Sequence, residues 1–178
     1  WYFDEAAKKL YLYATDAPKN IFVADKSGNG LSVNGGSQIK IQNITVQHFN
    51  ENGIFSSGTH NIYISDCLID YNYDRGIYTK DGSQTRIINC ELTGTTKVGI
   101  LNYNPTSIIR ECYIHDIGLA TQLNKNGFET GYAISSYGKN DTLTFNKLED
   151  IGYNGLELKN FTIVKNNSVK YVNLTTID

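Results

Sequence analysis

A repeat of about 23 residues constrains the fold of this chain more than any other feature of its sequence. A glycine or alanine followed by an aliphatic residue recurs at intervals of 23, 23, 23, 34 and 22 residues. The six copies are Gly30-Leu31, Gly53-Ile54, Gly76-Ile77, Gly99-Ile100, Ala133-Ile134 and Gly155-Leu156. A second column follows 12 to 14 residues later, at Ile44, Cys67, Cys90, Cys112, Asn146 and Asn167. A fixed period of this length indicates stacked structural units.

Within each unit the apolar residues alternate, which is typical of β-strands. Ile62 and Ile64 flank Tyr63, for example, and Gly, Asn, Asp and Ser separate the alternating segments. No sustained 3.6-residue stripe indicates a helix, and the Leu-x-x-Leu-x-Leu signature of leucine-rich repeats is missing. We therefore predict an all-β chain in which residues 25–178 form a right-handed parallel β-helix of about six coils, each with three strands.

Residues 1–24 precede the repeat and differ from it. Trp1-Tyr2-Phe3 and Leu10-Tyr11-Leu12-Tyr13 are separated by a charged segment, a pattern that predicts an N-terminal β-hairpin. The sequence stops within its sixth unit, so we expect the coils to be part of a longer domain. The remainder of that longer chain is then one expected partner.

The composition limits the other expected partners. The chain has 178 residues and a formal net charge of -2, which predicts no strong attraction to nucleic acid or to an anionic membrane. It contains no apolar run long enough for a membrane-spanning helix. We expect neither a nucleic-acid nor a membrane partner.

The three cysteines, Cys67, Cys90 and Cys112, occupy one predicted inward column on successive coils. No histidine lies in register with them, which makes a zinc site a poor interpretation. The distance between neighbouring coils, about 4.8 Å, leaves a disulfide open. The favoured interpretation is a stack of small buried side chains that gives way to Asn146 and Asn167, whose amides can bond from coil to coil.

Several segments resemble one known group of proteins. They are Trp-Tyr-x-Asp at the start, Leu-Tyr-Leu-Tyr after it, "HDIGL" at 115–119 and "DIGYNGLELKN" at 150–160. Together with the Gly-Ile and Asn columns they resemble secreted bacterial β-helix proteins of the pectate-lyase-like superfamily, many of which are glycoside hydrolases. The resemblance implies a secreted or cell-surface bacterial protein that acts on a polysaccharide. The same scaffold also carries lyases, epimerases and adhesins, so the fold does not decide the chemistry.

In that superfamily the substrate lies along the strand that here begins at the Gly-Ile column. Strand parity places every second residue of this strand on the outer face. This outer ladder comprises Ser32, Asn34, Phe55, Ser57, Tyr78, Lys80, Leu101, Tyr103, Ser135, Tyr137, Glu157 and Lys159. Aromatic rings stack on sugars and charged groups bind hydroxyls or carboxylates, so the predicted substrate-binding residues are Phe55, Tyr78, Lys80, Tyr103, Tyr137, Lys159 and Arg75. The alternative is that aromatic residues simply suit exposed strands.

The candidate catalytic groups lie in the turn before this strand, except Glu157, which is on the outer ladder itself. The one long interval of the repeat places an excursion at 118–132, and loops on a rigid scaffold often carry function. Glycosidic hydrolysis usually requires two carboxyl groups, and the candidates are Asp116, Glu129 and Glu157, with His115 beside them. Taken singly, each is better interpreted as a solvated or hydrogen-bonded turn residue.

Three functions remain open at this point. A glycoside hydrolase with paired carboxylates is favoured, and it requires no cofactor. A uronate lyase would need a cation and a base, for which Arg75, Lys80 and His115 are available. Calcium is possible but weakly supported, because Glu157 is the only acid on the outer ladder, and no other metal is expected. A non-catalytic carbohydrate-binding or adhesion module is the third possibility.

Overall fold

The structure is a computed structural model that describes residues 2–4, 9–11, 28–120 and 130–174. The described residues form twenty β-strands and no helix. A short antiparallel pair, β1 (Tyr2–Asp4) and β2 (Lys9–Tyr11), precedes the repeat. The repeat itself forms three parallel sheets of six strands each.

The three sheets are named by their order within a coil. Sheet 1 contains β3 (Leu31–Asn34), β6 (Asn52–Ser57), β9 (Arg75–Lys80), β12 (Val98–Asn102), β15 (Tyr132–Ser136) and β18 (Asn154–Leu158). Sheet 2 contains β4 (Lys40–Gln42), β7 (Tyr63–Ser65), β10 (Arg86–Ile88), β13 (Ile108–Arg110), β16 (Thr142–Thr144) and β19 (Ile163–Lys165). Sheet 3 contains β5 (Thr45–Gln47), β8 (Leu68–Asp70), β11 (Glu91–Thr93), β14 (Tyr113–Ile117), β17 (Lys147–Ile151) and β20 (Ser168–Val172).

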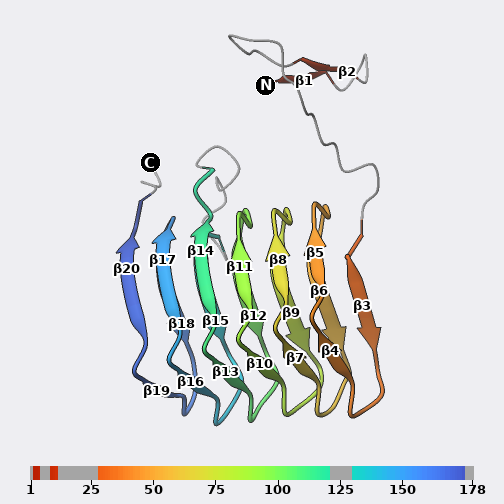
Figure 1. The fold of residues 1–178 in the computed structure, drawn as a ribbon, viewed down its shortest axis with the longest axis vertical. Helices are drawn as coiled ribbons and strands as arrows, with labels where there is room; N and C mark the ends of the chain where they lie inside the picture. Colours follow the sequence, from red (N-terminus) through yellow and green to blue (C-terminus); the bar gives the residue numbers. More distant parts are fainter. Residues whose placement is uncertain (1, 5–8, 12–27, 121–129, 175–178) are drawn as a thin grey trace.

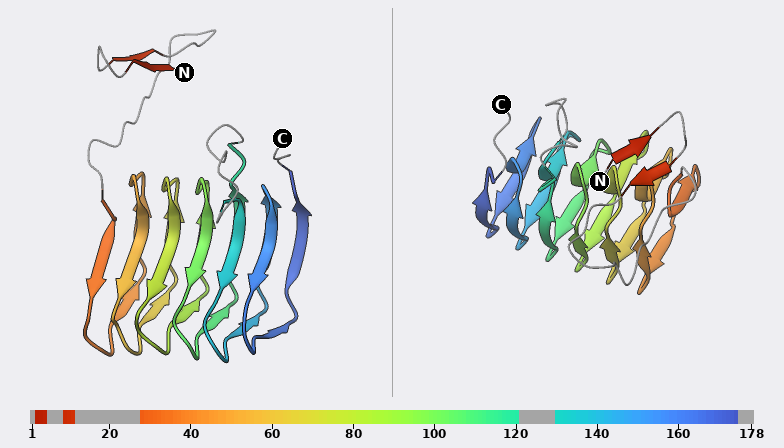
Figure 2. Two further views of the ribbon diagram at one scale, coloured as in Figure 1. Left: turned by 180° about the vertical axis from the view of Figure 1, so that it is seen from behind. Right: turned by 90° about the horizontal axis from the view of Figure 1, so that it is seen from above.

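Each strand pairs with the corresponding strand of the next coil. The six coils therefore lie side by side in sequence order, from β3 at one end to β20 at the other (Figures 1 and 2). Three parallel sheets wound in this way are a parallel β-helix. The predicted all-β fold, its coil number and its N-terminal hairpin are confirmed.

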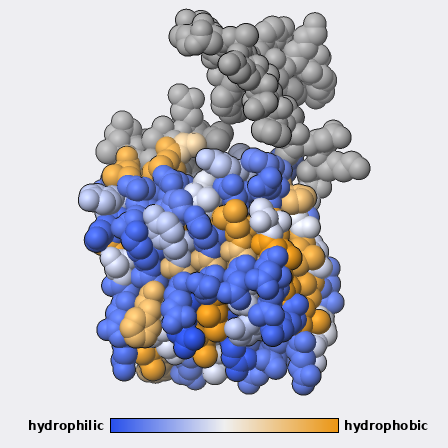
Figure 3. Space-filling model, in the orientation of Figure 1, coloured by the Kyte–Doolittle hydropathy of each residue, from blue (hydrophilic) through white to orange (hydrophobic). Residues whose placement is uncertain are grey.

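The predicted inward columns form the core. Ile54, Ile77, Ile100 and Ile134 are paired in one ladder on sheet 1, and none of them is exposed to solvent. The equivalent residues of sheets 2 and 3, such as Ile87 and Leu92, are also fully buried. The surface seen in Figure 3 is mainly hydrophilic, as expected where the apolar columns face inward.

At Gly76 and Gly99, in the Gly-Ile column of sheet 1, glycine is required by the close stacking of the coils. A Cβ added at Gly76 would lie 2.6 Å from the carbonyl oxygen of Gly99. A Cβ at Gly99 would lie equally close to the carbonyl oxygen of Ala133. A real Cβ cannot approach a backbone oxygen this closely, so neighbouring coils can keep their spacing here only if the residue has no side chain.

The cysteine column is buried and contains free thiols. Cys67, Cys90 and Cys112 are each at most 3% exposed. The Asn146 Oδ1 accepts the backbone N–H of Cys112 at 3.0 Å, and Asn167 accepts from Asn146 in the same way at 2.8 Å. The predicted transition from small buried side chains to an amide ladder is therefore confirmed.

The thiols should react slowly. The neighbouring Cys90 thiol and burial raise the pKa of Cys67, and the neighbouring Cys112 thiol raises the pKa of Cys90 to about 12. The reactive thiolate is correspondingly rare at neutral pH. We expect titration of the native protein with a thiol reagent to be much slower than titration of the denatured protein. Rapid labelling of all three thiols without unfolding would contradict the buried column.

Candidate functional site

The outer ladder of sheet 1 has the predicted register. Phe55 pairs with Ser32 and Tyr78, Leu101 pairs with Tyr78 and Ser135, and Ser135 pairs with Glu157. Their side chains therefore project to the same side of six successive strands, opposite to the core column. Sheet 1 is the element that positions the candidate binding residues.

Four aromatic side chains form a continuous row on this outer face. The ring centroids of Phe55 and Tyr78 are 5.4 Å apart, those of Tyr78 and Tyr103 are 6.1 Å apart, and those of Tyr103 and Tyr137 are 5.0 Å apart. The rings are tilted or edge-to-face, which is the favoured geometry for aromatic neighbours. We call these four residues the aromatic row. Tyr103 is the most exposed of them, at 40%.

Three cations rest against the aromatic row. The Arg75 guanidinium is 4.9 Å from the Tyr78 ring centroid, and the Lys159 ammonium is 4.2 Å from that of Tyr137. The Lys80 ammonium is 5.9 Å from the Phe55 ring centroid. These distances allow cation–π attraction, which fixes the charges on the same face as the rings.

The three cations differ in their other contacts. Arg75 is in an ion pair with Asp74, and Lys80 lies 3.4 Å from Asp81. Lys159 is exposed and forms no ion pair with any residue that the structure describes. The charge of Lys159 is therefore the one most available to a ligand.

The outer ladder is less open than strand parity alone predicts. Leu101 and Ser135 project outward but are at most 1% exposed. Val98, Leu101 and Tyr132 form a second apolar cluster outside the main core, against which Tyr78 and Tyr137 pack. The face is thus a packed aromatic surface over β12 and β15.

Glu157 and Ser135 have polar atoms that the fold leaves unbonded. The Glu157 Oε2 and the Ser135 Oγ are both enclosed, and neither has a hydrogen-bond partner within the described part of the chain. Glu157 is also the one carboxylate on the outer ladder, among the residues described on sheet 1. Enclosed polar atoms are normally paired, so these two atoms form an unusual feature of the face.

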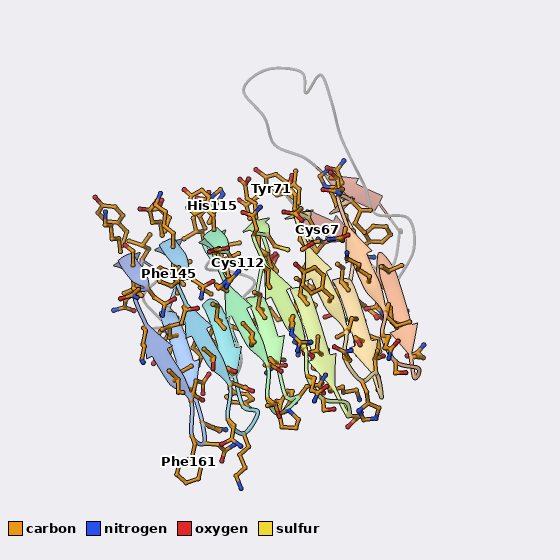
Figure 4. All side chains as sticks on the ribbon, turned by 60° about the horizontal axis from the view of Figure 1, so that its bottom comes forward. Cys67, Tyr71, Cys112, His115, Phe145 and Phe161 are labelled. Carbon is orange, nitrogen blue, oxygen red and sulfur yellow. The ribbon has the colours of Figure 1, made fainter. Side chains whose placement is uncertain are left out.

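His115 and Asp116 lie on a different sheet. Both belong to β14 of sheet 3, near the rim where Figure 4 shows His115 and Tyr71. The His115 Nδ1 is 2.6 Å from the Asp116 carboxylate, and its Nε2 is 3.2 Å from the Glu91 carboxylate. The Tyr113 ring stacks on the imidazole with a centroid distance of 4.3 Å. Every contact in this group comes from sheet 3.

The backbone gives Asp116 a structural role. Its φ angle is 53°, in the left-handed region, and Gly94 of the preceding coil has φ 64° at the equivalent turn position. Asp150 repeats this conformation in the next coil, with φ 53°. Short polar residues and glycine are the ones that adopt it most easily, which accounts for the aspartates at this position.

The structure therefore separates the candidate catalytic residues. It brings His115 and Asp116 together on sheet 3 and places Glu157 on sheet 1. No contact joins Glu157 to either of them among the residues that the structure describes. Glu129 lies outside the described residues.

The surroundings of His115 include residues that were not recognised from the sequence. Its column on sheet 3 contains Asp70, Thr93 and Glu149, which are paired with it coil by coil. Burial raises the pKa of the Asp70 carboxyl. A hydrogen bond from Lys147 lowers the pKa of Glu149. The repeat spacing that aligned the cysteines could have aligned these residues as well.

A depression lies away from the aromatic row, where sheet 2 turns into sheet 3. It has a volume of about 360 Å³ and is lined by Asp66, Cys67, Leu68, Asn89, Cys90, Glu91, Glu111 and Tyr113. The Asn89 amide donates to the Asp66 carboxylate at 2.7 Å, and this bond lowers the pKa of Asp66. Asp66 and Asn89 are thus bonded to each other, whereas Ser135 and Glu157 on sheet 1 have enclosed polar atoms without partners, so the face on sheet 1 is the better candidate site.

The described residues lack two further features. They contain no group of three or more His, Cys, Asp or Glu side chains arranged to hold a metal ion. They also contain no helix with the length and apolar character of a membrane span.

Comparison with known proteins identifies the family but no individual relative. A search of curated proteins and a search of solved structures each gave no significant match. The sequence profile described as "Right handed beta helix region" matches residues 18–169, which covers most of the chain. With its three parallel sheets and six stacked coils, the chain belongs to the right-handed β-helix family.

Proposed function

We propose that this protein binds a polysaccharide along the outer face of sheet 1. The observation that carries the proposal is the aromatic row, in which Phe55, Tyr78, Tyr103 and Tyr137 contact one another in sequence. Aromatic surfaces of this kind bind the apolar faces of sugar rings. The adjacent Lys159 and Glu157 supply a hydrogen-bond donor and an acceptor for hydroxyl groups.

The length of the aromatic row supports a polymeric ligand. Its members come from four successive coils, and neighbouring coils are separated by about 4.8 Å, so the row extends about 15 Å along the stack. Several sugar residues of one chain can lie along such a distance. The sequence resemblance to secreted bacterial polysaccharide-active proteins supports the same ligand class and a location outside the cell. The proposal requires no cofactor.

Removing one ring of the row provides the test. We expect Tyr78→Ala to weaken binding to the best ligand of a polysaccharide panel by about tenfold or more, because it removes a stacking surface in the middle of the row. Isothermal titration calorimetry or affinity electrophoresis measures the change. Tyr71→Ala is the matched control, since Tyr71 is 61% exposed but lies at the rim of sheet 3 (Figure 4).

Both variants should remain folded because neither side chain belongs to the main core inside the coils. Equal loss of affinity in Tyr71→Ala and Tyr78→Ala would locate the ligand elsewhere. Failure of the wild-type protein to bind any polysaccharide of the panel would also contradict the proposal.

Hydrolysis of the bound polysaccharide is the second candidate function. The specific observation that favours it is Glu157, whose enclosed Oε2 lies on the same face as the aromatic row. A hydrolase needs a second carboxyl group near the first, and Asp116 is on sheet 3. Glu129 is then the remaining candidate among the residues proposed from the sequence.

A uronate lyase receives less support. Its proposed cations Arg75 and Lys80 are already in contact with Asp74 and Asp81. The proposed base, His115, lies on sheet 3 between two carboxylates. The three groups therefore do not converge on one point of the aromatic face.

A further inference from the structure

We propose that Ser135, Tyr137, Glu157 and Lys159 form a subsite that selects a sugar residue with uncharged hydroxyl groups. This inference rests on the proposed binding of a polysaccharide at the aromatic row. It goes further because it assigns one position of the groove and the chemical class of the sugar bound there. We call these four residues the coil-5 subsite, after the fifth coil, which carries Ser135 and Tyr137; Glu157 and Lys159 lie on the sixth coil.

The geometry of the coil-5 subsite follows from strand pairing. Ser135 and Glu157 are direct partners in the ladder between β15 and β18, and Tyr137 and Lys159 lie two residues further along. The four side chains occupy the corners of a cell of about 4.8 by 6.6 Å. That cell is comparable in size to a single pyranose ring. Lys159 closes one edge by resting 4.2 Å from the centre of the Tyr137 ring.

Two enclosed polar atoms in this cell lack partners. The Ser135 residue is completely buried, yet its Oγ has no hydrogen-bond partner in the described part of the chain, and the same is true of the Glu157 Oε2. These atoms belong to neighbouring residues on the same face, but they do not bond to each other. A ligand hydroxyl can satisfy both, because it donates to the carboxylate and accepts from the serine O–H.

We expect a ligand to enter the cell from the side of Lys159, which is the exposed member of the four residues. Lys159 is exposed, and it forms no ion pair with another residue in the described ranges. It can therefore turn away from Tyr137 without breaking a salt bridge, and its ammonium can then donate to a second hydroxyl. The Glu157 end of the cell also limits the ligand: a uronate carboxylate placed beside Ser135 would face the Glu157 carboxylate across a short distance, and Lys159 forms no described ion pair with Glu157 that would neutralise it.

The first experiment tests the role of Ser135. We expect Ser135→Ala to weaken binding to the best neutral polysaccharide of the panel by about tenfold, because a ligand hydrogen bond is lost. The same change should raise Tm by about 2–4 °C, because it removes a buried hydroxyl that has no partner in the free protein. A serine with a purely structural bond would give the opposite shift in Tm.

Ser56→Ala is the matched control. Ser56 is also completely buried with an unpartnered Oγ, but it belongs to the inward-facing set of sheet 1. The Ser56→Ala substitution should raise Tm in the same way and leave polysaccharide binding unchanged. If affinity falls in Ser135→Ala but not in Ser56→Ala, the loss comes from a missing ligand contact and not from a change in the fold.

The second experiment tests the charge of the subsite with polymers that share a backbone. The probes are polygalacturonate and its carboxyl-reduced form, and glucuronoxylan and xylan. In whichever pair contains a ligand, we expect the wild-type protein to bind the uncharged polymer more tightly than the charged one. Glu157→Gln should reduce that preference by about tenfold, because the amide still accepts a hydroxyl proton but no longer repels a carboxylate.

The outcomes separate this inference from the proposed function. If Tyr78→Ala abolishes binding while Ser135→Ala and Glu157→Gln leave affinity and charge preference unchanged, the coil-5 subsite is wrong and the aromatic row stands. In that case water satisfies the two polar atoms. If Tyr78→Ala also has no effect, or no polymer binds, both proposals are wrong. Weaker binding in Ser135→Ala, together with the altered preference in Glu157→Gln, supports both.

Discussion

Ile77→Asp is expected to prevent folding of the coils. Ile77 is completely buried between Ile54 and Ile100 in the core ladder of sheet 1. An aspartate at this position would place a carboxylate among aliphatic side chains with no partner, at a cost of about 4 kcal/mol or more. That amount is comparable with the total stability of many domains. Circular dichroism and thermal denaturation of the purified variant measure the effect.

The control for this prediction is an aspartate on the outer side of the same sheet. Ser32 is exposed on β3, so Ser32→Asp should change the free energy of unfolding by no more than about 0.5 kcal/mol. A soluble Ile77→Asp protein that unfolds cooperatively, with a Tm close to that of the wild type, would show that the inward and outward faces have been assigned incorrectly.

Glu157→Gln is expected to have the largest effect on turnover if the protein hydrolyses its polysaccharide. Removal of a catalytic acid or base typically lowers kcat by about 10²- to 10⁴-fold. The substitution keeps the size of the side chain, and Glu157 accepts no described hydrogen bond at its Oε2, so Tm should change little. The assay should use the native polysaccharide and the longest natural form of the protein, so that any further part of the site is present.

The result has a clear consequence for the mechanism. Unchanged kcat and KM in Glu157→Gln would remove Glu157 from the catalytic step, and the same measurement would then be made on Glu129→Gln and Asp116→Asn. Loss of turnover with retained binding of the neutral polymer would assign Glu157 a chemical role. Absence of turnover in the wild-type protein would leave polysaccharide binding as the function.

The fold was predictable because the repeat aligns residues without any structural information. The 23-residue interval places Ile54 on Ile77 and Cys67 on Cys90, and period-two alternation states which residues face inward. Local sequence and long-range pairing therefore give the same answer for the core. The long interval after Gly99 does not disturb the alignment of the core column, because Ile134 still pairs with Ile100.

The candidate site was only partly predictable. Strand parity correctly aligned Phe55 with Tyr78, but it could not show that Leu101 and Ser135 are enclosed. Their burial depends on side-chain packing across neighbouring coils, in the cluster that contains Tyr132. Similarly, the sequence places His115 just before sheet 1, whereas its side chain bonds to residues of sheet 3.

Oxidative footprinting of tyrosine side chains, with and without polysaccharide, tests the central claim most directly. Tyr103 is 40% exposed on the aromatic row, and Tyr71 is 61% exposed at the rim of sheet 3, so both should be modified in the free protein. We predict that saturating polysaccharide protects Tyr103, and with it Tyr78 and Tyr137, while Tyr71 is modified at the same rate as before. Protection of Tyr71 with no change at Tyr103 would contradict a polysaccharide-binding face on sheet 1.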